Sequence, residues 1–94
     1  MNHAEFDWDF ENITHLARHS VTPDEAESVF EGPLLFLEKQ SWAGEIRFVD
    51  VGMTTNGRIL QVITTERGSR TRILTAYDPE KAVCRRFMNS FEPS

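Results

Sequence analysis

The chain has 94 residues, 39% of them hydrophobic, and a formal net charge of −5. It is therefore too apolar for a disordered chain, and it is long enough for one domain with a thin core. Its longest purely apolar run, Pro33–Leu37, excludes a membrane-spanning helix, which needs about 20 apolar residues. The acidic start lacks the pattern of a signal peptide, and a single cysteine, Cys84, fits a reducing cytoplasm. We expect one cytoplasmic domain spanning residues 1–94.

Charge is distributed unevenly along the chain. Residues 1–45 carry two basic and ten acidic side chains, a net charge of −8, whereas residues 46–94 carry eight basic and five acidic ones, a net charge of +3. A net charge of −5 on average disfavours nucleic acid as a partner, but such asymmetry allows one basic face on an acidic protein. The alternative is that the two halves neutralise each other in the fold, and the sequence does not decide between them.

The N-terminal third predicts a short edge strand and two helices. Phe6–Trp8 places two aromatic side chains on one face, which is typical of a strand. Asn12–His19 carries Ile13, Leu16 and Ala17 at i, i+3 and i+4, which predicts an amphipathic helix.

The second helix has the clearest local signal in the chain. Thr22 suits the N-cap, Pro23 suits the first helical position, and Glu25 completes a capping box. Gly32 and Pro33 predict the end of this helix.

Three further strands and their turns can be placed by the same reasoning. Leu34–Glu38 predicts a strand, Lys39–Gly44 a loop with an exposed Trp42, and Ile46–Thr54 a second strand. Asn56 and Gly57 predict a two-residue hairpin turn. The resulting register pairs Met53 with Leu60, Val51 with Val62, Val49 with Thr64 and Arg47 with Glu66.

The next turn fixes the register of the last strand, which ends at Tyr77. A three-residue loop of Arg67–Ser69 pairs Glu66 with Arg70, Thr64 with Arg72, Val62 with Leu74 and Leu60 with Ala76. A loop of even length would instead put Arg70 and Arg72 on the face opposite Glu66. The three-residue loop predicts a core row of Met53, Val51, Val49, Leu60, Val62, Leu74 and Ala76. The other face, with Phe48, Ile59, Ile63, Ile73 and Tyr77, is then apolar enough to favour a partner.

The chain closes with a predicted helix from Asp78 as N-cap to about Asn89, with a stripe of Val83, Phe87 and Phe91. The fold class expected is α+β. It has a largely antiparallel sheet of four main strands, a short N-terminal edge strand, two N-terminal helices and one C-terminal helix.

No cofactor-binding motif is present, and a metal site is disfavoured. His15 and His19 lie at i, i+4 on a predicted helix, but no third ligand is evident. The remaining chemistry is a carboxylate among guanidinium groups, formed by Glu66, Arg70 and Arg72 with Arg47 on the neighbouring strand. RNA cleavage without metal needs a base, an acid and cations for the phosphate charge. The alternative is a solvated ladder of ion pairs that contributes little, and the residues by themselves favour it.

In order and spacing, several segments resemble the BrnT toxin family, the ribonuclease half of a bacterial toxin–antitoxin pair with a RelE-like fold. They are FDWD, HLARHSV, TPDEAESVF and GRILQVITTERGSRTRILTAY. The matching residues are Phe6, Trp8, Asp9, Asn12, His19, Val21, Glu25, Ala26, Val29, Phe30, Gly57, Arg58, Leu60, Thr65, Glu66, Arg67, Gly68, Arg72, Ile73 and Ala76. The resemblance implies an RNA substrate, a protein antitoxin, no cofactor and no membrane partner.

The resemblance also suggests roles for individual residues. His19, Glu66 and Arg72 would be catalytic, with Arg18 assisting His19. Phosphate contacts and RNA steering would fall to Arg18, Arg47, Arg67, Arg70, Arg85 and Arg86. The family pattern has Lys-His-Gly where this chain has Arg18-His19-Ser20, and an arginine where it has Tyr77, which would stack on a base or donate a proton. These departures favour the alternative of a catalytically degenerate module that acts through an antitoxin or homodimer interface.

Overall fold

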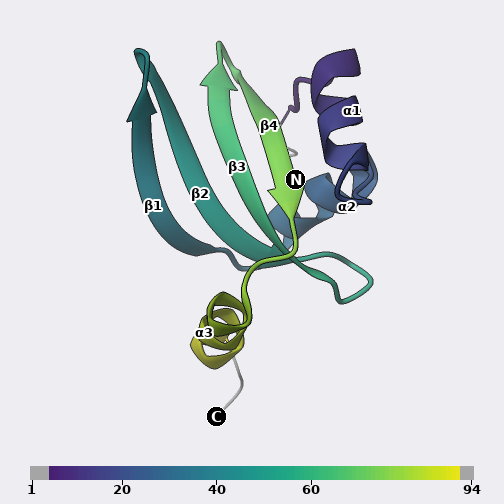
Figure 1. Cartoon of the computed structure of the whole chain (residues 1–94), viewed down its shortest axis with the longest axis vertical. Coiled ribbons are helices and arrows are strands. Elements are labelled where there is room, and N and C mark those ends of the chain that lie inside the picture. Colours follow the sequence, from purple (N-terminus) through teal and green to yellow (C-terminus); the bar gives the residue numbers. More distant parts are fainter. Residues whose placement is uncertain (1–4, 92–94) are drawn as a thin grey trace.

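A computed structural model describes residues 5–91 and shows an α+β fold (Figure 1). Four antiparallel strands lie in the order β1-β2-β3-β4, with two helices before them and one after, as expected. The elements are α1 (Phe10–Ala17), α2 (Pro23–Ser28), the 3-10 turn η1 (Val29–Glu31), β1 (Leu35–Trp42), β2 (Glu45–Met53), β3 (Ile59–Arg67), β4 (Arg70–Tyr77) and α3 (Lys81–Phe91). None of the helices in this part of the chain is long and apolar enough to cross a membrane.

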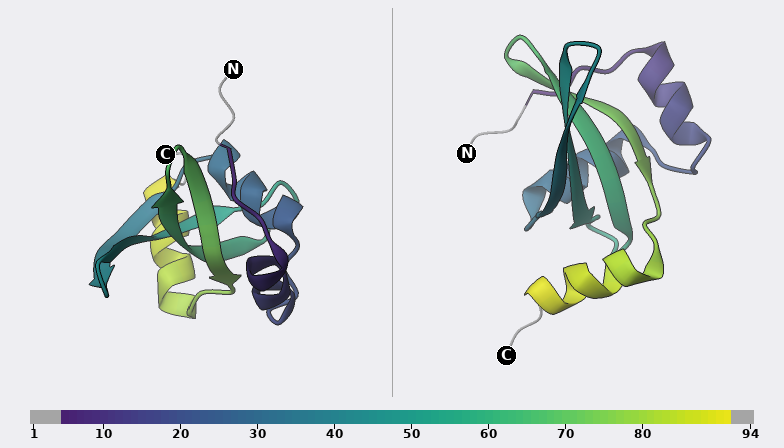
Figure 2. Two further views of the ribbon diagram at one scale, coloured as in Figure 1. Left: turned by 90° about the horizontal axis from the view of Figure 1, so that it is seen from above. Right: turned by 60° about the vertical axis from the view of Figure 1, so that its left-hand side comes forward.

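The hydrophobic core lies between the N-terminal helices and the β3–β4 half of the sheet. Its buried members are Leu16, Val21, Ala26, Val29, Leu60, Val62, Ile73 and Ala76. α3 lies beyond the end of the sheet where β4 finishes, away from α1 and α2 (Figure 2). The core therefore packs α1 and α2 against β3 and β4. α3 is the next element after β4 in the chain.

Capping boxes begin both N-terminal helices. Thr22 Oγ1 accepts a hydrogen bond from the Glu25 N–H at 3.1 Å, and Glu25 Oε1 accepts one from the Thr22 N–H at 3.0 Å, as predicted. α1 begins earlier than predicted because Asp9 and Asn12 form the same box. Of the predicted stripe of α1, Leu16 is buried as expected, but Ile13 and Ala17 are exposed and Asn12 is the second buried residue.

β1 continues through the segment predicted to be a loop. Its last residue, Trp42, is 66% exposed, as expected, but it belongs to the strand. The turn is the two residues Ala43 and Gly44, both with positive φ (48° and 81°). This backbone matches the twist of a tight hairpin. The sequence has no Asn-Gly or Asp-Gly pair at this position that would have predicted a two-residue turn.

The predicted register of β2 and β3 was wrong by one residue. Three residues, Thr55–Gly57, form the loop, because Thr54 and Arg58 pair across it with a 2.7 Å bond from the Thr54 N–H to the Arg58 carbonyl. Gly57 has φ 88°, so it supplies the left-handed residue that a three-residue loop requires. Val51 therefore pairs with Gln61 and Val49 with Ile63, which places both valines on the face opposite Leu60 and Val62.

The register of β3 and β4 also differs from the prediction. The loop has two residues, Gly68 and Ser69, so Arg67 pairs with Arg70, Glu66 with Thr71 and Thr65 with Arg72. A bulge then shifts the register between Ile63 and Thr64. The two-residue loop pairs Ile73 with Thr64, so Ile73 is fully buried in the core in place of Leu74, and the bulge returns Ala76 to the same face. The rejected alternative, a loop of even length, is the correct one.

Two smaller features complete the frame of the site. The N-terminal segment forms a single parallel bridge between Phe6 and Thr71, so it covers the outer edge of β4 where a short edge strand was expected. α3 starts at Lys81 and not at Pro79 as predicted. The Asp78 carboxylate binds Arg58.

Candidate functional site

The arginines near the β3–β4 turn form ion pairs with acidic side chains. Glu45 Oε2 lies 3.0 Å from Arg47, and Glu45 Oε1 lies 3.3 Å from Arg67. The pKa of Glu45 is lowered, chiefly by its hydrogen bond with Arg47 and against the opposing effect of its desolvation. Arg70 lies 3.5 Å from Glu5. At this end of the sheet, acids of the first half of the chain neutralise arginines of the second half.

Arg72 is buried, with only 4% of its side chain exposed, and it faces three carboxylates. Its guanidinium lies 3.0 Å from Asp9, 3.4 Å from Asp7 and 3.4 Å from Glu11. The hydrogen bond with Asp9 raises the pKa of Arg72 and, in return, lowers the pKa of Asp9. Arg72 therefore fastens the N-terminal segment and α1 to β4.

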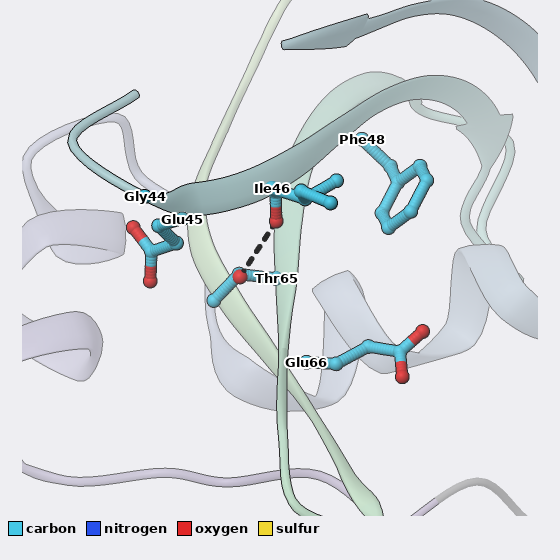
Figure 3. A pocket seen from close by; sticks show the side chains of 6 residues that line it. All are labelled: Gly44, Glu45, Ile46, Phe48, Thr65 and Glu66. Carbon is cyan, nitrogen blue, oxygen red and sulfur yellow. Dashed lines mark hydrogen bonds between the residues drawn. The ribbon is translucent and has the colours of Figure 1, made fainter. Parts of the chain in front are cut away.

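Glu66 lies on the other face of the sheet, at the rim of a hollow of about 460 Å³ lined by Gly44, Glu45, Ile46, Phe48, Thr65 and Glu66 (Figure 3). The side chains of Ile46, Phe48 and Glu66 lie on one side of the strands, while Glu45 points the other way. Thr65 Oγ1 donates a 2.8 Å bond to the Ile46 carbonyl, which ties β2 to β3 beneath the hollow. Glu66 and Arg72 consequently do not share one site.

A second group of titratable side chains lies at the opposite end of β4. The rings of His19 and Tyr77 are 5.7 Å apart, and those of His15 and His19 are 5.9 Å apart. Both histidines are exposed, and Tyr77 is half-buried at the last position of β4. Gln61 Nε2 donates a 3.1 Å hydrogen bond to the Tyr77 hydroxyl oxygen. The hydroxyl hydrogen of Tyr77 is then directed to some other acceptor.

His19 owes its position to the end of α1. The Ser20 N–H binds the Ala17 carbonyl at 3.0 Å, and the Val21 N–H binds the Leu16 carbonyl at 3.1 Å. These two bonds form a Schellman motif, in which Ser20 takes the left-handed position with φ 57°. The motif leaves the carbonyls of His19 and Ser20 without a partner inside the helix.

Arg58 supplies that partner. Its Nη1 donates to the Ser20 carbonyl at 2.7 Å, its Nη2 to the His19 carbonyl at 3.1 Å, and its Nε to Asp78 Oδ1 at 3.0 Å. The hydrogen bond with Asp78 raises the pKa of Arg58, so the guanidinium stays charged. The sequence suggested no role for Arg58 in the site, because its acceptors lie 38 and 39 residues away along the chain.

Comparison with known proteins identifies the family. Residues 8–82 match the sequence model of the family described as the ribonuclease toxin, BrnT, of a type II toxin–antitoxin system. The chain belongs to the BrnT family. No curated protein matches the chain significantly. The BrnT family is a family of ribonuclease toxins of type II systems, which implies RNA as substrate and an antitoxin as cognate partner.

The structure separates the residues that the BrnT resemblance grouped together. Glu66 pairs with Thr71, and Tyr77 lies six positions after Thr71 in β4. Six residues of a strand span about 20 Å. His19 and Tyr77 therefore lie together at one end, with Arg18 next to His19 in the chain, while Glu66, Arg67 and Arg70 lie at the other. Arg85 and Arg86 are exposed on α3, four and five residues after its start.

The acidic and histidine side chains of the described residues are dispersed. Within residues 5–91, no three His, Cys, Asp or Glu side chains lie close enough together to hold a metal ion. His15 and His19 are neighbours, as their spacing predicts, and the ring next to His19 on its other side is that of Tyr77.

Proposed function

We propose that this BrnT-family chain is a metal-independent endoribonuclease and that cleavage takes place at the end of β4 where His19 meets Tyr77. The observation that carries the proposal is the pair of rings 5.7 Å apart, contributed by two different elements on an open surface. Two rings this close can both contact one phosphodiester group.

The reaction requires proton transfer at two oxygens. The 2′-hydroxyl attacks the adjacent phosphorus as a base removes its proton, and the leaving 5′-oxygen takes a proton from an acid. His19 suits the first step because imidazole is the commonest general base. Tyr77 suits the second, since Gln61 already donates to its oxygen and leaves the hydroxyl hydrogen free to be given up. An alternative role for Tyr77 is to stack on a base.

Cations would stabilise the additional charge on the phosphate. Arg18 follows α1 directly before His19, and Arg85 and Arg86 lie on the helix that follows Tyr77. Arginine matches phosphate oxygens with two parallel donors. We assign Arg18 to the reacting phosphate, and Arg85 with Arg86 to the flanking RNA.

A competing placement puts the chemistry at the β3–β4 turn. There Glu66 would accept a proton, Arg72 would stabilise the phosphate, and Arg47, Arg67 and Arg70 would hold the RNA. The ion pairs of these arginines argue against it, because RNA would have to displace Glu45, Glu5 and the three acids around Arg72. We therefore favour the His19 end.

Cleavage of a fluorescently labelled RNA by the purified protein in excess EDTA tests both placements. We expect cleavage to persist without divalent metal, and His19→Ala and Tyr77→Phe to lower the rate by about 10²–10⁴-fold. Glu66→Gln is the matched variant at the other end, and it should retain activity. Loss of activity in Glu66→Gln with retention in His19→Ala would move the site to the β3–β4 turn. If EDTA abolished cleavage, the proposal of a metal-independent reaction would be wrong.

The second candidate function is a catalytically inactive module that binds the antitoxin or a second copy of itself. It is favoured by the exposed apolar side chains of Phe36, Trp42 and Ile46, of which Trp42 is 66% exposed. A folded wild-type protein that neither cleaves RNA nor arrests growth, yet binds its antitoxin, would support it. A monomer without an accessible apolar patch, detected by a hydrophobic dye, would contradict it.

A further inference from the structure

We infer that Arg58 is a positioning residue that sets the relative placement of His19 and Tyr77. The inference rests on the proposed cleavage site. Arg58 is not assigned a contact with RNA, because all three of its donor nitrogens already have partners within the protein.

The first half of the argument concerns the chain around His19. The carbonyls of His19 and Ser20 lie at the negative end of α1, where intrahelical donors have run out. Arg58 donates to both carbonyls at once, at 3.1 and 2.7 Å. These two bonds hold the orientation of the peptide group that follows His19. The direction in which the His19 side chain leaves the backbone is therefore held as well.

The second half concerns Tyr77. The third donor of Arg58, Nε, binds the carboxylate of Asp78, the residue after Tyr77, at 3.0 Å. One planar guanidinium therefore joins the two chain segments that carry the two rings. Lysine can substitute for it only in part, because a single ammonium group lacks the rigid fork that reaches three acceptors at once.

Arg58 itself is held by the β2–β3 turn. Its N–H donates to Thr54 Oγ1 at 3.0 Å, and its carbonyl accepts from the Thr54 N–H at 2.7 Å. Thr54 is only 3% exposed, so the base of the arginine is anchored in the protein interior. A second acid, Glu25, lies 3.8 Å from Nη1 and adds to the charge that holds the guanidinium in place.

Two measurements test the inference, and the first needs no RNA. In the wild type, NMR should show a nuclear Overhauser contact between the ring protons of His19 and Tyr77. Arg58→Gln should abolish it, and Arg58→Lys should weaken it. Asp78→Asn removes the charge that binds Nε but retains the two carbonyl bonds, so it should weaken the contact less than Arg58→Gln does. Persistence of the contact in Arg58→Gln would overturn the inference, whatever the protein does to RNA.

The second measurement separates positioning from RNA binding. For RNA cleavage, Arg58→Gln should lower kcat on the order of 10–100-fold while KM changes by less than about twofold, because misplaced groups slow the chemical step. Arg58→Lys should recover only part of the rate. A raised KM with unchanged kcat would show that Arg58 binds RNA, which contradicts the inference.

A destabilised variant with an intact site controls for loss of fold. A Cβ at Gly52 would lie 2.9 Å from Leu34 Cδ2 and 3.0 Å from Val29 Cβ, so Gly52→Ala should lower Tm without touching Arg58. Its kcat at a temperature where it is folded should equal that of the wild type. If it loses kcat as Arg58→Gln does, the effect of Arg58 is one of stability and the inference fails. A wild type that shows the ring contact but cleaves no RNA would defeat the proposed function alone.

Discussion

Ser20 occupies a position that favours glycine. It is the left-handed residue of the Schellman motif after α1, with φ 57°. A side chain in this conformation costs roughly 1–2 kcal/mol, whereas glycine adopts it freely. The BrnT resemblance places a glycine here, so the departure at Ser20 has a physical cost at the residue that follows His19.

We expect Ser20→Gly to stabilise the protein by about 0.5–1 kcal/mol, because relief of the strained φ exceeds the added freedom of glycine in the unfolded chain. In a domain of this size, 1 kcal/mol corresponds to a rise in Tm of about 4–8 °C. Thermal unfolding followed by circular dichroism measures it. Ser20→Ala keeps the strained φ and removes only the hydroxyl. An equal rise in that variant would show that the left-handed backbone is not the cause.

Single residues of the site were predictable only where their signal was local. Helical spacing predicts that His15 and His19 lie side by side, and the proximity of their rings is confirmed. The role of Arg58 was not predictable, since its acceptors are backbone carbonyls, which have no sequence signature, and an aspartate 20 residues away. The grouping of Glu66 with Arg72 was wrong, because it depended on a register that differs by one residue from the one observed.

Among the elements, helix starts were predictable and strand registers were not. The capping box of Thr22 and Glu25 lies within four residues, so the sequence contains all of it. Register depends on loop length, and the two hairpin loops next to β3 have three and two residues where two and three were predicted. The bulge at Leu74 adds a further shift that no turn residue signals.

Arg72 joins β4 to the N-terminal segment through its ion pairs, and these ion pairs should weaken in acid. The pKa of Asp9 is lowered from its ordinary value of 3.8, chiefly by its hydrogen bond with Arg72. A lowered pKa means that the folded protein binds this proton less readily than the unfolded chain does. The stabilisation is therefore complete above about pH 4 and is lost as the pH falls further, through the lowered pKa.

We expect Asp9→Asn to be less stable than the wild type at pH 7 and to approach it at pH 3, since asparagine retains the N-cap and removes only the charge. Urea unfolding at the two pH values measures this difference. Asp9→Ala should be less stable than Asp9→Asn at both pH values, because it also removes the cap. A gap between wild type and Asp9→Asn that stays constant with pH would refute the role of the charge.

At the scale of the whole molecule, much of the uneven charge along the sequence is neutralised by ion pairs among the described residues. Arginines of the second half bind acids of the first half at four places, through Arg58 with Glu25, Arg47 and Arg67 with Glu45, Arg70 with Glu5, and Arg72 with its three partners. The sequence allowed neutralisation or a basic face, and neutralisation holds for these five arginines. Within residues 5–91, ion pairs involve neither Arg18 nor the two arginines of α3. The arginines of this part of the chain that lie outside these ion pairs are thus next to His19 and on the helix that follows Tyr77.

Salt dependence of RNA binding should reveal which end the RNA occupies. Each phosphate contact adds about 0.7 to the slope of log K against log salt for a single strand. We expect Arg85→Ala with Arg86→Ala to lower the magnitude of this slope by roughly 1.4, with the helix intact because alanine is the best helix former. Fluorescence anisotropy of a short labelled RNA, titrated at several salt concentrations, measures the slope. Arg67→Ala with Arg70→Ala removes the same charge from the β3–β4 turn, where Glu45 and Glu5 already bind it, and should change the slope less. The reverse order of effects would place the RNA along the β3–β4 turn and would count against cleavage at His19 and Tyr77.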